Sequence, residues 1–186
     1  GPHARRIYYP LLEKYQQQYN LHLALLIDRR EQADAVRGYL AGRALQPENL
    51  LFIDEHPNGD EPPGDELLTA LRELTARQHI DGIIIATEPR AHKVYALWAI
   101  LNHVDVLVDK PVTAPPGASV EVHAARQVFA DYGDLERCLR FSTSNVIVQA
   151  QRRSHAGYAL IKQYLDEFTH KYPLPVSYMD IYHGDG

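Results

Sequence analysis

The sequence predicts an α/β fold in which a doubly wound parallel sheet carries helices on both faces, followed by the start of a second domain. Short runs that are wholly apolar, such as residues 82–86, suit strands covered on both faces, as in a parallel sheet. They alternate with segments whose apolar residues recur at helical spacing, as in residues 91–101. Residues 176–182 instead alternate between two sets of side chains, which is typical of a half-exposed antiparallel strand. We therefore expect one domain over residues 1–153, and over residues 154–186 a connecting helix and the first strand of a second, mainly antiparallel α/β domain.

Helix and strand alternate twice in the first third of the chain. Apolar residues at helical spacing predict a helix from residue 7 onward and another over residues 31–41. Uninterrupted apolar runs predict strands over residues 21–27 and 49–53. Residues 54–64 contain three prolines and two glycines, so we expect a surface loop there.

The same alternation continues through the middle of the chain. Four leucines on one face predict a helix over residues 65–78, which leads to the strand at residues 82–86. A helix from residue 91 is expected to end near residue 102. A second apolar run then predicts a strand over residues 104–108.

The last third begins with an irregular, proline-rich stretch at residues 112–117. A helix is expected over residues 119–139, with a break near residues 132–133, where a glycine follows a tyrosine. A buried strand over residues 145–150 and a helix over residues 155–170 complete the predicted elements before the final strand.

Composition limits the classes of protein to consider. The 186 residues carry a formal net charge of -5 and lack the basic patch of a nucleic-acid-binding protein. We find no apolar run long enough to span a bilayer and no signal peptide, and Cys138 is the single cysteine, so a reducing, cytoplasmic location is expected. The ten histidines form no H-x-x-x-H or Cys/His cluster, so we predict no metal site.

Polar residues follow two neighbouring strands of the predicted sheet. Residues 87–92 come directly after one strand, and Asp109 and Lys110 come directly after the next. In open α/β sheets, ligands bind beyond the carboxyl ends of the strands. We therefore expect the chemistry of this protein at these two places.

Asp28 ends the strand at residues 21–27, which is where a dinucleotide-binding fold holds the ribose hydroxyls. Gly1 and Ala4 fit the last two small positions of a G-x-G-x-x-G/A turn, with the first glycine and its strand expected upstream of Gly1. Alternatively, Asp28 caps the helix that follows it. The sequence pattern leaves both interpretations open.

The order of strand, T-x-P-x-x-H, helix, strand and acid-Lys-Pro resembles the Gfo/Idh/MocA family of NAD(P)-dependent sugar and cyclitol oxidoreductases. The first motif stands here as T-E-P-R-A-H at residues 87–92, and the second as D-K-P at residues 109–111. Gln151-Arg152-Arg153 is similar to the family's paired arginines after the sixth strand. Two departures from the usual motifs are Asp109 in place of glutamate and Glu88-Pro89 in place of Pro-Asn.

The resemblance implies a Rossmann-like domain that lacks its first strand. It also implies transfer of a hydride between a nicotinamide dinucleotide and a sugar, cyclitol or related hydroxy or keto substrate. Lys110 is the implied catalytic residue, donating a hydrogen bond to the substrate oxygen and stabilising negative charge there. Asp109 is expected to orient this lysine or to contact the nicotinamide ribose, and Pro111 to be a candidate for a cis peptide. Without the resemblance, Lys110 would be interpreted as a strand-end lysine extending into solvent.

Cofactor contacts are expected from the residues at the predicted turn and strand ends. These are Gly1, Ala4, Asp28, Arg29, Thr87, Glu88, His92, Asp109 and Lys110. The cofactor that the resemblance implies is NAD or NADP. Asp28 favours NAD because a carboxylate repels a 2′-phosphate, whereas the arginines after it could accommodate that phosphate. Glu88 could equally serve as a helix N-terminal acid, and His92 as a local cap or packing residue.

Arg152 and Arg153 are the expected substrate contacts, and the pattern does not indicate which of them faces the cleft. The partners implied are a small-molecule substrate and further copies of the chain in a dimer or tetramer, with no nucleic acid and no membrane. The alternative function is a non-catalytic nucleotide-binding or regulatory protein with the same fold. A flavodoxin-like interaction domain fits the D-K-P motif less well.

Overall fold

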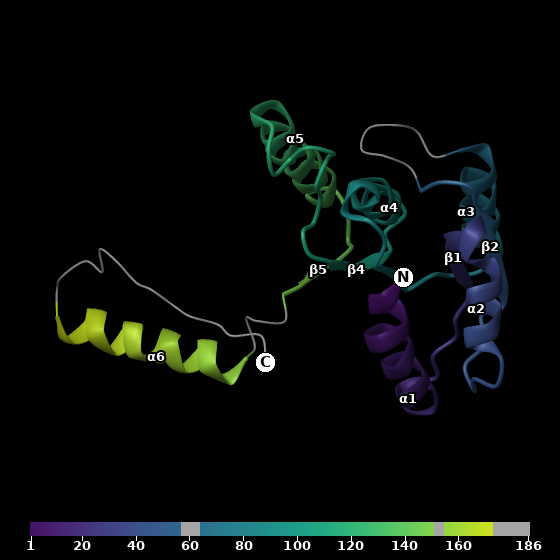
Figure 1. Cartoon of the computed structure of the whole chain (residues 1–186), viewed down its shortest axis with the longest axis horizontal. Coiled ribbons are helices and arrows are strands. Elements are labelled where there is room, and N and C mark those ends of the chain that lie inside the picture. The colour runs from purple at the N-terminus through teal and green to yellow at the C-terminus, as the bar shows by residue number, and fades with distance from the viewer. Residues whose placement is uncertain (57–63, 151–154, 173–186) are drawn as a thin grey trace. The chain divides into compact units, whose positions relative to one another are not determined.

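The computed structural model of the chain describes residues 1–56, 64–150 and 155–172 (Figure 1). The chain divides into two compact units, Gly1–Gln149 and Ala150–Gly186. The predicted strand at residues 176–182 and the two arginines at 152 and 153 lie outside the described residues. Their structure and roles stay predictions.

The first unit alternates helices and parallel strands, as the sequence predicts. Its helices are a π-helical turn at Ala4–Tyr8 that continues into α1 (Tyr9–Tyr19), a 3-10 turn at Arg30–Gln32 that continues into α2 (Ala33–Leu40), α3 (Asp65–Arg77), α4 (Pro89–Leu101) and α5 (Val122–Leu139). Its strands are β1 (Leu25–Arg29), β2 (Asn49–Ile53), β3 (Gly82–Ile85), β4 (Asp105–Asp109) and β5 (Val146–Gln149).

The described strands form two sheets, with the orders β1-β2 and β3-β4-β5. Every pair is parallel, and the register aligns the carboxyl ends: Arg29 pairs with Ile53, and Asp109 with Gln149. Within the described residues, β1 and β3 therefore each have a neighbouring strand on one side only. A cavity of about 1220 Å³ is lined by the apolar residues of both strands.

The larger core is formed by α4 and the three-stranded sheet, together with residues of α3, α5 and β2. Val106 and Val108 of β4 are 2% and 0% exposed, and Ala99 and Ile100 of α4 are 0% and 1% exposed. On the opposite face of the sheet, Ile147 is 60% exposed. Ile147 belongs to β5, which has a neighbouring strand on one side only within the described residues.

Helix α5 differs from the prediction in two respects, its continuity and its first residue. It runs without interruption from Val122 to Leu139, so the predicted break near residues 132–133 is wrong. Asp131 and Leu135 are buried on either side of Gly133, and this packing outweighs the roughly 1 kcal/mol helix penalty of a glycine. The helix also starts later than residue 119, because Gly117 adopts a positive φ of 79° in the preceding turns.

The described part of the second unit is helix α6 (Ala156–Lys171), close to its predicted limits. His155 caps it, because its Nδ1 accepts a hydrogen bond of 3.1 Å from the amide of Gly157. Among all described helices, none has the length and apolar character needed to cross a bilayer.

Candidate cofactor site

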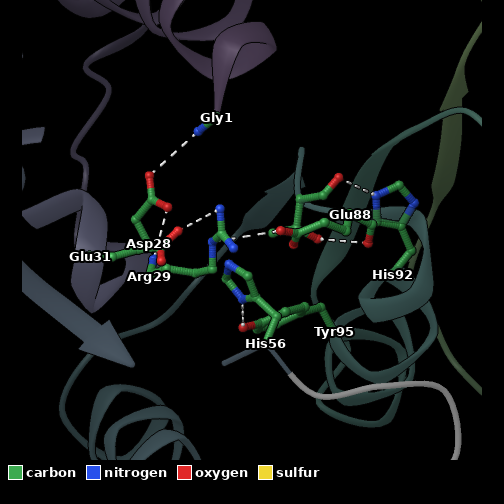
Figure 2. Close-up of polar contacts among 9 residues, drawn as sticks. Gly1, Asp28, Arg29, Glu31, His56, Glu88, His92 and Tyr95 are labelled. Carbon is green, nitrogen blue, oxygen red and sulfur yellow. Dashed lines mark hydrogen bonds and ion pairs between the residues drawn. The ribbon is translucent and has the colours of Figure 1, made fainter. Parts of the chain in front are cut away.

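The carboxyl ends of β1 and β3 bring together residues that are distant in the sequence (Figure 2). The amino nitrogen of Gly1 lies 3.4 Å from Oδ2 of Asp28. The backbone amide of Arg29 donates a 2.8 Å hydrogen bond to Oδ1 of the same carboxylate. Gly1 and the acidic strand end therefore lie side by side, and the expected roles of Gly1, Ala4 and Asp28 in cofactor binding stay predictions.

The alternative role of Asp28 as a helix cap is wrong. The N-cap positions of the 3-10 turn and of α2 are Arg29 and Gln32, and neither end carries a side-chain cap hydrogen bond. Because Asp28 lies within β1, its carboxylate stays beside Gly1. The ribose-binding interpretation of Asp28 stays a prediction.

Arg29 lies between two carboxylates. Its Nη2 is 2.8 Å from Glu31 Oε1, and its Nε is 3.7 Å from Glu88 Oε1 (Figure 2). Glu88 occupies the N-cap position of α4 but makes no side-chain cap hydrogen bond. The Arg29–Glu88 pair instead connects the carboxyl ends of β1 and β3.

His56 and Tyr95 form a second polar contact, which the sequence analysis missed. Nδ1 of His56 lies 2.9 Å from the Tyr95 hydroxyl, and these residues are 5% and 3% exposed. Burial lowers the pKa of His56, an effect that nearby Glu88 and Asp28 partly oppose. Burial also raises the pKa of Tyr95, to which the same two carboxylates add, so both side chains are uncharged at neutral pH. His56 follows β2, so the strand-end rule applied to the other strands would have found it.

Asp109 contacts the first helical turns of the chain. Its Oδ1 accepts a short hydrogen bond from the Tyr8 hydroxyl, and its Oδ2 lies 2.9 Å from Nδ1 of His3. Burial, followed by the hydrogen bond to Asp109, raises the pKa of Tyr8. Neither Tyr8 nor His3 was singled out from the sequence. The described contacts of the Asp109 side chain are these two, and its expected role of orienting Lys110 or contacting the nicotinamide ribose stays a prediction.

Lys110 is exposed, and its side chain makes no ion pair or hydrogen bond with another described residue. The Lys110–Pro111 peptide bond is cis, which confirms the expectation for this proline. Lys110 thus stands at the carboxyl end of β4, where the sequence places it.

His92 is fully buried in the first turn of α4 and contacts two backbone carbonyls. Its Nδ1 lies 2.9 Å from Pro111 O, and its Nε2 lies 3.1 Å from Thr87 O. Carbonyl oxygens only accept hydrogen bonds, so a neutral ring satisfies one of these contacts and a doubly protonated ring satisfies both. His92 therefore ties the segment after β3 to the segment after β4.

The cavity divides the predicted cofactor residues into two groups. Its lining includes a first group, made up of Gly1, Ala4, Asp28, Arg29, Thr87 and Glu88. His92, Asp109 and Lys110 are not part of that lining. Within the described residues, no group of three or more His, Cys, Asp or Glu side chains is arranged to hold a metal ion.

A parallel α/β sheet with a small-residue turn beside an acidic strand end defines the class of dinucleotide-binding domains. Residues 6–130 match the Gfo/Idh/MocA family, which is described as an oxidoreductase family with an NAD-binding Rossmann fold. This match covers more than half of the chain. The protein therefore belongs to the Gfo/Idh/MocA oxidoreductase family, and its first unit is an NAD-binding Rossmann domain.

A solved structure shows the same fold. The WlbA (WbpB) dehydrogenase from Thermus thermophilus, in complex with NAD and alpha-ketoglutarate, is 16% identical, with a TM-score of 0.56 over 85% of this chain and 42% of that one. A Klebsiella pneumoniae structure described as that of a putative oxidoreductase is 18% identical, with a TM-score of 0.45 over 91% of this chain and 38% of that one. The chain thus spans about two fifths of the length of these proteins. A search of curated proteins finds no match.

Proposed function

We propose that the complete protein is an oxidoreductase that moves a hydride between a nicotinamide dinucleotide and a sugar, cyclitol or related hydroxy or keto compound. Membership of the Gfo/Idh/MocA family supports the reaction class. The observation that carries the proposal is the grouping of Gly1, Asp28 and Glu88 around one cavity at the carboxyl ends of parallel strands. Ligands of open α/β sheets bind at such a position.

The charges at the end of β1 favour NAD over NADP. The Asp28 carboxylate accepts hydrogen bonds, which suits ribose hydroxyls and repels a 2′-phosphate. Arg29 is a cation that could attract that phosphate, and Glu31 and Glu88 flank its guanidinium. Its positive charge is therefore largely balanced before any ligand binds.

Lys110 is the proposed catalytic residue. A bound nicotinamide supplies the hydride chemistry, and the protein aligns the substrate and handles the hydroxyl proton. An exposed ammonium at a strand end can donate a hydrogen bond to the substrate oxygen and stabilise negative charge there. Arg152 and Arg153 remain the proposed contacts for the substrate.

The cavity between the two sheets supports the proposed first strand. Leu25 and Ile27 line one side, and Ile83 and Ile85 line the other. A parallel strand entering just before Gly1 would pair with both β1 and β3. It would also end beside Asp28, where the small-residue turn begins.

One observation favours a second candidate function, a nucleotide-binding protein without turnover. Asp109 is bound to Tyr8 and His3, so it does not orient Lys110 in this structure. A lysine without a carboxylate partner is less constrained as a catalytic group. The two candidates make the same prediction for cofactor binding and opposite predictions for turnover.

The proposal is tested by titrating the complete protein with NADH and with NADPH and measuring the nicotinamide fluorescence at each addition. We expect NADH to bind more tightly than NADPH. Lys110→Ala should abolish turnover and leave NADH binding within about twofold, because the lysine acts on the substrate oxygen rather than on the dinucleotide. Arg140→Ala, which removes an exposed cation directly after α5, is the matched control and should leave both unchanged.

Loss of both binding and turnover in Lys110→Ala would show that the lysine is structural. Binding of NADH without turnover of any polyol or keto compound by the unaltered protein would support the nucleotide-binding candidate.

A further inference from the structure

A buried ion pair joins α4 to α5 at some distance from the cavity. Lys93 and Asp131 are 3% and 1% exposed, and Nζ of the lysine lies 2.8 Å from Oδ1 of the aspartate. Nζ also lies 3.0 Å from Oδ2 of Asp134, which is partly exposed. Two buried charges are costly unless hydrogen bonds satisfy their remaining atoms. The partners of Asp131 therefore indicate what the pair is for.

Both oxygens of Asp131 accept further hydrogen bonds. Nε2 of Gln127 donates to Oδ1 over 2.9 Å, and the hydroxyl of Thr113 donates to Oδ2 over 2.9 Å. Burial alone would raise the pKa of Asp131, but the bonds from Lys93, Gln127 and Thr113 outweigh it and lower that pKa. Asp131 is thus a carboxylate at neutral pH, with one oxygen committed to Thr113.

Thr113 lies in the segment that directly follows Lys110, and this segment is held at three points. The Pro111 carbonyl is 2.9 Å from His92 Nδ1. The Thr113 hydroxyl is bound to Asp131, and the Ala114 amide donates to the Pro89 carbonyl over 3.4 Å. On the other side of Lys110, the strand β4 is fixed by its pairing with β3 and β5. The backbone that carries the exposed lysine is therefore anchored before and after it.

We propose that Asp131 is a positioning residue for Lys110. Held in place by buried Lys93, it anchors Thr113 and so fixes the direction in which the chain leaves β4 and presents the lysine. This inference rests on the proposed catalytic role of Lys110. It adds to that role a buried network on α4 and α5 that has no contact with the cavity.

The geometry separates this role from simple joining of two helices. A pair that only joined α4 and α5 would need Lys93 and a hydrogen-bond donor on either helix, such as Gln127. The Thr113 hydroxyl comes instead from the connecting segment, is 4% exposed, and is directed at the second oxygen. That bond is the one to remove, since its loss leaves the Lys93–Asp131 pair intact.

The test compares Thr113→Val, which deletes the hydroxyl at nearly constant volume, with Thr113→Ser, which keeps a hydroxyl. The matched control is Thr75→Val on α3, where the lost hydroxyl bonds only its own helix. Each variant of the complete protein is measured for kcat, KM, NADH affinity, thermal midpoint and amide exchange at residues 110–114.

We expect Thr113→Val to lower kcat roughly tenfold to a hundredfold, since small displacements of a reacting group have effects of that size. NADH affinity should stay within about twofold, and exchange at residues 110–114 should become faster. Thr113→Ser should restore most of kcat, and Thr75→Val should resemble the unaltered protein. An unchanged kcat in Thr113→Val, or a loss of thermal stability with kcat unchanged, would overturn the inference.

Failure of the proposed function can be told apart from failure of this inference. If the unaltered protein has no turnover, the comparison of amide exchange between the two valine variants tests the anchoring of residues 110–114 by itself. Faster exchange at residues 110–114 in Thr113→Val, but not in Thr75→Val, would then support the anchor, and equal rates would refute it.

Discussion

The buried side chain of His56 makes the stability of the folded protein depend on pH. It is 5% exposed, bonded to Tyr95, and its pKa is lowered by burial. A histidine with a lower pKa in the folded state binds its proton more readily in the unfolded chain. The stability that neutral His56 provides is therefore complete above its ordinary pKa of 6.5 and declines as the pH falls below that value.

We expect the free energy of unfolding of the complete protein to decrease as the pH is lowered from about 7.5 to about 5.5, the range in which histidine titrates. His56→Gln should weaken this dependence and cost about 1–3 kcal/mol near neutral pH, because the Tyr95 hydroxyl loses its partner. Urea unfolding at several pH values measures both effects. Exposed His22 provides the control, and His22→Gln should keep the original dependence. An identical pH dependence in His56→Gln would contradict the assignment.

Residue identities alone predicted part of the site. Asp28, Glu88 and Asp109 were found because each stands at or just after the carboxyl end of a strand, and strand ends can be recognised from local pattern. Their partners could not be found in this way. Tyr8 and Asp109 are 101 positions apart, and nothing in the pattern around either residue specifies the contact.

At the scale of elements, residues at the start of α4 contact the chain at or after the ends of three strands. Glu88 reaches Arg29 at the end of β1, and His92 bonds the carbonyls of Thr87 after β3 and of Pro111 after β4. One helical turn thus determines where the chain leaves each of these strands. This explains why the T-x-P-x-x-H motif places a histidine at a buried position that does not line the cavity.

We expect His92→Phe to destabilise the complete protein by about 1–3 kcal/mol, because it removes the buried imidazole whose ring nitrogens contact the carbonyls of Thr87 and Pro111. Amide exchange at residues 111–114 should become faster at the same time. Urea unfolding and exchange measurements check the two effects. His123→Phe, at an exposed position of α5, should change neither. Unchanged stability of His92→Phe would mean that the two contacts contribute nothing.

Helix α5 shows where prediction by element is weakest. A break was predicted at Gly133 because glycine is a poor helix former, yet the helix continues through it. Propensity is a local quantity, whereas Asp131 is held in the helix by Lys93 on α4 and by Thr113. Contacts between elements outweighed a preference that the sequence expresses only locally.

At the scale of the whole molecule, the first unit contains two sheets separated by a cavity of about 1220 Å³. The amides of a β-strand point alternately to its two edges, and β1 and β3 each have a neighbour on one edge within the described residues. A parallel strand from upstream of Gly1, as proposed, would pair with both free edges and join the sheets into one.

We expect amide exchange to reveal this strand. In a chain of residues 1–186, alternate amides of β1 and β3 should exchange quickly, and in the complete protein all of them should be protected. Strand β4 is the internal control, since it pairs with β3 on one side and β5 on the other and should be protected in both. The same alternating pattern in both chains would exclude a strand in the cavity.

The sequence by itself determined the order of helices and parallel strands, the positions of the strand ends, and the family motifs at residues 87–92 and 109–111. These follow from local periodicity and spacing, which any short window of the chain contains. Tertiary structure alone decided the contacts of those motifs: Asp109 with Tyr8 and His3, His56 with Tyr95, and Lys93 with Asp131. Such contacts depend on how distant elements pack, and packing is a property of the folded chain that no single segment carries.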